Sequence, residues 1–106
     1  MILDAASLYA YFVQDSPQHW AVTGRVELAA GHEKLVVSPF VIVNLEVMVR
    51  ERVGVEGWLL ALEQLASGAW TIASVDAEHL DAVRARVAAG ATLAGASVAV
   101  LVEADS

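Results

Sequence analysis

The chain has 106 residues, of which 58% are hydrophobic and none is cysteine, and its formal net charge is −7. This length is enough for one buried core and is close to the usual size of one domain, so two domains are not expected. The absence of cysteine excludes a disulfide framework and thiolate metal sites, which fits a cytoplasmic protein. The net negative charge argues against a protein that binds nucleic-acid phosphates by electrostatic attraction alone.

The amino terminus lacks the layout of a secretory signal, because Asp4 interrupts its apolar run and no basic segment precedes it. Charged residues break the other apolar runs well short of the roughly 20 residues that cross a bilayer. The sequence therefore predicts a chain without a membrane span.

The first residues predict a strand, an acid and a helix in succession. Residues 1–4 form an apolar run that ends in Asp4, and the alanine-rich segment after it favours a short helix. Asp4 then lies at the carboxyl end of the strand, where binding and catalytic groups collect in open parallel sheets. Ser16 before Pro17 is typical of an N-cap and a first helical residue, which predicts a helix over residues 17–30.

The middle of the chain predicts a second strand followed by a helix. Residues 34–38 form a short β-branched run, and Ser38 with Pro39 repeats the cap pattern ahead of a segment that ends at Gly54. Residues 43–49 alternate apolar and polar side chains, a pattern that fits a strand as well as a helix. The cap, the basic residues near the end and the terminal glycine favour a helix.

The last part predicts a helix, a strand and a further helix before an ambiguous ending. Residues 56–67 carry apolar side chains at helical spacing, and the AWTIASV segment after them is typical of a strand. Asp76 is the predicted N-cap of the next helix. The apolar stripe predicted for that helix consists of Leu80, Val83 and Val87. Residues 91–106 fit either a strand or a helix.

Strands and helices thus alternate along the whole chain. This order predicts an α/β fold, with a parallel sheet flanked by helices on both faces in a three-layer sandwich. Internal repeats, low-complexity tracts and linkers are absent from the sequence. Residues 1–106 are therefore expected to form a single domain.

The order of these features resembles that of VapC-type PIN-domain ribonuclease toxins, the toxins of type II toxin–antitoxin systems. The resemblance covers nearly the whole chain and rests on five segments, which are the strand ending in Asp4, Asp15-Ser16-Pro17, LVVSPFVIVNLE, LEQLASGAW and DAEHL. It implies a PIN-like fold whose carboxyl-terminal part is shorter than in the family. It also implies a cytoplasmic ribonuclease that hydrolyses RNA phosphodiester bonds with Mg²⁺ or Mn²⁺.

The resemblance further implies where the acids of the site stand. Asp4 matches the first family acid and is the leading candidate for a catalytic residue and metal ligand. Asn44 stands where the family has a glutamate, and Gly95 where it has an aspartate. Asn44 is kept as a catalytic candidate because its carbonyl oxygen is a neutral ligand, and Glu46 is kept as a metal candidate. On a helix Glu46 points roughly 200° away from Asn44, whereas on a strand the two share a face.

Each of these candidates also has a plainer interpretation. Asp4 is also suited to cap the helix that follows it, although the site interpretation is favoured. Asn44 and Glu46 are equally well explained as polar, solvent-facing residues on an otherwise apolar element. The three histidines show no spacing typical of metal ligands. Ser38 and Ser97 show no arrangement with histidine and aspartate that would support nucleophilic catalysis.

Three functions are therefore open. The first is a ribonuclease toxin that is weak or inactive, because a site with one of three acids holds its Mg²⁺ or Mn²⁺ cofactor poorly or has lost it. The second is a non-catalytic, degenerate PIN domain that binds a cognate antitoxin protein or forms a homodimer. The third is an unrelated small α/β interaction domain.

Overall fold

The computed structural model describes residues 1–105. Its elements are β1 (Ile2–Leu3), α1 (Ala5–Phe12), α2 (His19–Ala30), β2 (Val36–Val37), α3 (Pro39–Leu65), β3 (Thr71–Ile72), α4 (Ala77–Ala88) and α5 (Leu93–Asp105). The strands are short and pair in parallel in the order β1-β2-β3, with Ile2 opposite Val36 and Val36 opposite Thr71. The predicted parallel sheet is confirmed.

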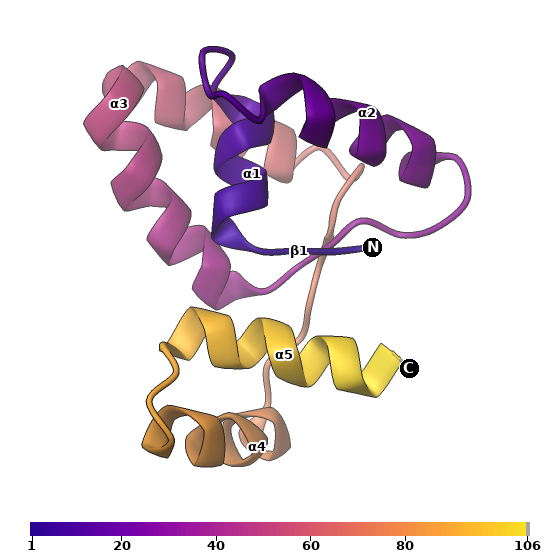
Figure 1. Cartoon of the computed structure of the whole chain (residues 1–106), viewed down its shortest axis with the longest axis vertical. Helices are drawn as coiled ribbons and strands as arrows, with labels where there is room; N and C mark the ends of the chain where they lie inside the picture. Colours follow the sequence, from indigo (N-terminus) through magenta and orange to yellow (C-terminus); the bar gives the residue numbers. More distant parts are fainter. Residues whose placement is uncertain (106) are drawn as a thin grey trace.

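The helices cover both faces of this sheet (Figure 1). Helices α1, α2 and α3 lie on one side of the strands, and the α4 and α5 pair lies on the other. Helix α1 packs against α2 and α3, while α5 contacts α3, α4 and β1. The predicted three-layer arrangement is therefore present.

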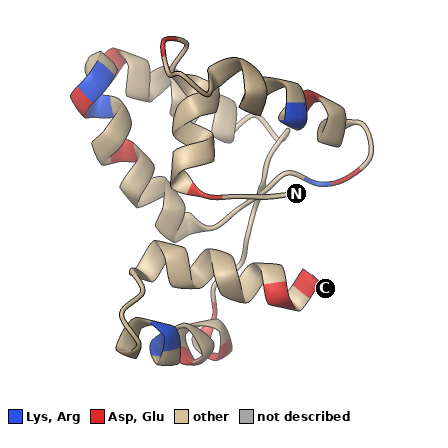
Figure 2. Cartoon of the chain, viewed as in Figure 1, with Lys and Arg blue, Asp and Glu red and all other residues tan. Residues whose placement is uncertain are grey.

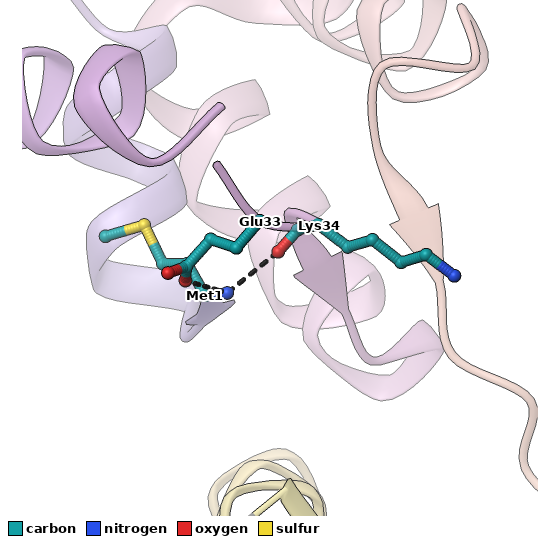
Figure 3. A network of polar contacts seen from close by, with 3 residues as sticks. All are labelled: Met1, Glu33 and Lys34. Atoms are coloured by element: carbon teal, nitrogen blue, oxygen red, sulfur yellow. Dashed lines mark hydrogen bonds and ion pairs between the residues drawn. The ribbon is translucent and has the colours of Figure 1, made fainter. Parts of the chain in front are cut away.

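Strand β1 is tied to the segment before β2 from its first residue onwards. The amino group of Met1 donates to the carbonyl oxygen of Lys34 at 2.7 Å and forms an ion pair with Glu33 (Figure 3). The N–H of Val36 donates back to the carbonyl oxygen of Met1, also at 2.7 Å. Because the two strands run parallel, their carboxyl ends, including Asp4, emerge at the same edge of the sheet.

Two of the three predicted N-caps are confirmed. The side chains of Ser38 and Asp76 accept backbone N–H groups in the first turns of α3 and α4. The prediction for Ser16 is wrong, because α2 begins only at His19. The N–H of His19 donates to the carbonyl oxygen of Ser16 at 3.0 Å, so residues 16–19 form a β-turn. Pro17 is its second residue, a position at which proline is common.

Helix α3 consists of two helical segments that meet at Gly54, where the first was predicted to end. Gly54 has non-helical backbone angles, φ 76° and ψ −176°, and the segment that follows the kink runs to Leu65, close to the predicted helix over residues 56–67. Before the bend, Val41, Leu45 and Val49 are buried at a spacing of four residues. Val43 and Val47 are each 64% exposed, although on a strand they would share a face with the three buried residues. Residues 43–49 are therefore helix, as predicted, and the strand alternative is excluded.

The apolar stripe predicted for α4 is only partly confirmed. Val83 is 2% exposed, whereas Leu80 and Val87 are 46% and 41% exposed. Helix α4 packs mainly against α5. One neighbouring helix buries only part of the apolar face that the spacing of these residues predicts. Residues 93–105 form α5, which decides the ambiguity in that segment in favour of a helix.

Within residues 1–105 no single helix combines the length and apolar character needed to cross a bilayer. Helices α4 and α5 meet those criteria only when taken together, and they are bent by 120° relative to each other.

Candidate active site

A pocket of about 200 Å³ lies at the carboxyl end of β1. Its walls come from three parts of the chain. Asp4 lies at the start of α1, Val41 and Asn44 belong to α3, and Thr92 and Gly95 belong to the start of α5. The fold thus brings together the three positions at which the resemblance implies acids. Among the residues that line the pocket, Asp4 alone has an acidic side chain.

Asp4 has a structural role in addition to its place in the pocket. It is the N-cap of α1, and its Oδ1 accepts the N–H of Ser7 at 2.8 Å. Its side chain is exposed. The cap uses one oxygen of a carboxylate that has two, so capping does not prevent Asp4 from acting on a molecule in the pocket.

Asn44 and Glu46 point in different directions. Asn44 lines the pocket, but Glu46 is absent from its walls. Glu46 instead accepts a hydrogen bond from Arg50, one helical turn further on, at 3.4 Å. The reason is that residues 43–49 are helical, so two positions separate these side chains by roughly 200°. Metal binding by Glu46 stays a prediction that this arrangement does not favour.

Gly95 contributes only backbone to the pocket. Its N–H donates to Thr92 Oγ1 at 3.0 Å, which satisfies one of the free amides at the start of α5. A Cβ atom added at Gly95 would lie 3.0 Å from the same hydroxyl oxygen. A side chain there is possible if Thr92 rotates by a small amount, so the missing acid reflects the residue type and not a lack of space.

The pocket residues do not fit a resident divalent cation. Hard cations such as Mg²⁺ prefer charged oxygen ligands, and here one carboxylate that already caps a helix faces one neutral amide. Across residues 1–105, no three His, Asp or Glu side chains gather in a way that could hold a metal ion. Figure 2 shows the acidic residues dispersed over helices and loops. A cation would be held weakly at this pocket.

A hydrogen-bond chain that no sequence pattern predicted adjoins the pocket. The hydroxyl oxygens of Ser38 and Ser97 lie 2.7 Å apart, and Ser97 Oγ lies 2.8 Å from His79 Nε2. Both serines are fully buried. The three residues belong to the starts of α3 and α4 and to α5, so no local spacing could reveal their contact.

No family model matches the chain. It is 41% identical over 81 residues to ribonuclease VapC26 of Mycobacterium tuberculosis, a match that covers 76% of this chain and 58% of VapC26. The aligned part therefore spans little more than half of that relative. The crystal structure of Mycobacterium tuberculosis VapC20, described as a sarcin-ricin loop cleaving toxin, superposes with a TM-score of 0.83 at 12% identity. That match covers 98% of this chain and 82% of the VapC20 chain.

Proposed function

We propose that the chain belongs to the VapC-type PIN domains, because it is 41% identical to VapC26 over 81 residues and shares the fold of VapC20. On that premise it is a toxin-type ribonuclease that cleaves RNA phosphodiester bonds slowly. The observation that carries the proposal is the pocket in which position 4 meets positions 44 and 95. The low rate follows from the residues there, because two of the three acids implied by the resemblance are replaced by Asn44 and Gly95.

VapC-type ribonucleases are generally metal-dependent, and the acids of the site supply the charge that holds the cation. In this chain Asp4 is left as the group that accepts a proton from an attacking water. Such general bases typically contribute about 10²–10⁴-fold to a rate. Asn44 offers an amide N–H to a phosphate oxygen and a carbonyl oxygen to water. One base and one neutral amide support a much lower rate than a full acid set.

We also propose a protein partner, namely a cognate antitoxin or a second copy of the chain, in the cytoplasm. The amount of apolar side chain at the surface supports this part of the proposal. Val43 and Val47 on the outer side of α3 are each 64% exposed, and Leu60 beyond the bend is 66% exposed. Val43 and Val47 lie one helical turn apart and so adjoin on one side of α3, and contiguous exposed apolar side chains are typical of surfaces that a partner covers.

The proposal is tested by incubating the purified chain and its Asp4→Asn variant with single-stranded RNA and Mn²⁺. Slow cleavage by the unmodified chain is expected, together with its loss in the variant. Asparagine caps helices about as well as aspartate, so the variant removes charge from the pocket while preserving α1. Circular dichroism of both proteins checks that the fold is kept.

Two outcomes contradict the proposal. A folded but wholly inactive chain would favour the non-catalytic alternative, in which the domain only binds its partner. Equal cleavage by the chain and its variant would show that Asp4 has no part in the reaction, or that the activity comes from a contaminating nuclease.

A further inference from the structure

Ser97 connects three helices through a single hydroxyl group. It belongs to α5, its oxygen contacts Ser38 at the start of α3, and it also contacts His79 in α4. Ser38 and Ser97 are 0% exposed, so water does not compete for the hydrogen bond between them, whereas the bond to His79 is partly buried. Helix α4 otherwise packs mainly on α5. These two hydrogen bonds therefore form a polar connection between α4 and the start of α3.

The number of hydroxyl hydrogens assigns which group donates in each of these hydrogen bonds. Ser38 Oγ already accepts the N–H of Phe40 at 3.2 Å, and each hydroxyl has one hydrogen to donate. If Ser38 donates to Ser97 and Ser97 donates to His79 Nε2, both buried hydrogens have acceptors. In the opposite direction the hydrogen of Ser38 would have no partner among the described residues, which is costly for a buried donor. His79 Nε2 is therefore the acceptor, and the hydrogen of the neutral ring is on Nδ1.

We propose that Ser97 is a positioning residue, which sets the separation between the pocket walls at positions 44 and 95. Gly95 lies two residues before Ser97 in the same helix, about 3 Å along its axis. Ser38 caps the helix that carries Asn44. Because each helix is stiff over so short a length, the hydrogen bond between the two serines fixes one wall relative to the other. The inference rests on the proposed function, since this separation matters only for a molecule bound in the pocket.

The test uses the chain carrying Asn44→Glu and Gly95→Asp, in which all three positions hold acids, and measures its affinity for Mn²⁺ by titration. Adding Ser97→Ala is expected to weaken Mn²⁺ binding by about 10-fold to 100-fold, the usual effect of removing a group that orients metal ligands. Ser97→Thr keeps the hydroxyl and is expected to restore most of the affinity. His79→Phe removes the acceptor for Ser97 but leaves the hydrogen bond between the two serines in place, so it should weaken Mn²⁺ binding less than Ser97→Ala.

A matched control separates positioning from general destabilisation. Val83→Ala creates a cavity at a buried residue of α4 that takes no part in the hydrogen-bond chain. It should lower the melting temperature and leave the Mn²⁺ affinity unchanged. Unchanged affinity in Ser97→Ala, or an equal loss in Val83→Ala, would overturn the positioning role.

The ring nitrogens of His79 give an independent readout in the unmodified chain. Nitrogen-15 NMR is expected to show a hydrogen on Nδ1 and none on Nε2, and this signature should be lost in Ser97→Ala. A hydrogen on Nε2 would overturn the assigned direction. If the chain with three acids binds no Mn²⁺ at all, the proposed function fails, and the tautomer of His79 still decides whether the hydrogen-bond chain exists as described.

Discussion

The chain carrying Asn44→Glu and Gly95→Asp is expected to cleave RNA at least about 100-fold faster than the unmodified chain at the same Mn²⁺ concentration. A factor of 100 corresponds to about 2.7 kcal/mol of the activation barrier. This is the effect typical of one preorganised electrostatic group in an active site. Here two charged oxygen ligands are added to a pocket that already contains Asp4. The measurement is the initial rate of cleavage of a labelled single-stranded RNA.

Both substitutions are compatible with the fold. Asn44 is exposed on α3, where glutamate is a good helix former. At Gly95 the added Cβ requires only a small adjustment of the Thr92 hydroxyl. An acid in the first turn of α5 is also favoured by the helix dipole.

The matched control is the chain carrying Asn44→Gln and Gly95→Asn, which has closely similar backbone and volume changes without the charge. It should cleave no faster than the unmodified chain. A gain in this control, or no gain in the charged pair, would mean that the missing acids are not what limits the rate.

Leu45→Ala is expected to lower the free energy of unfolding by about 2–5 kcal/mol, the usual cost of truncating a fully buried leucine. Leu45 is 0% exposed and lies between Val41 and Val49 on the inner side of α3. A loss of this size is a large part of the total stability of about 5–15 kcal/mol typical of a domain. Urea unfolding, followed by circular dichroism, measures it.

Val47→Ala provides the comparison for Leu45→Ala. Val47 is two residues further on and 64% exposed, so its truncation should change the stability by less than about 0.5 kcal/mol. Residues two apart share a face on a strand and lie on opposite sides of a helix. Equal losses in the two variants would contradict the helix at residues 43–49.

Much of the fold could be predicted because its local signals agree with its packing. The apolar run before Asp4 and the caps at Ser38 and Asp76 mark strand ends and helix starts that the structure contains. Ser16 was misleading because a serine followed by proline suits a turn as well as a helix start. The sequence alone cannot distinguish these two, since the choice depends on where the next helix is able to pack.

The exposed stripe of α4 and the hydrogen-bond chain through Ser97 depend on tertiary structure. Periodicity predicts which side of a helix is apolar, but the number of neighbouring elements decides how much of that side is buried. The contact of Ser38 with Ser97 joins residues 59 positions apart. The convergence of positions 4, 44 and 95 was anticipated only because the resemblance to a family supplied the long-range arrangement.

If positions 4, 44 and 95 surround one pocket that holds a single acid, a paramagnetic ion should distinguish the unmodified chain from the chain with three acids. Mn²⁺ added to the chain carrying Asn44→Glu and Gly95→Asp should broaden the backbone amide NMR signals of all three positions together. The unmodified chain should show little broadening there at the same concentration. Broadening at only one of the three positions in the substituted chain, or equal broadening in both chains, would contradict a shared pocket that lacks two of its acids.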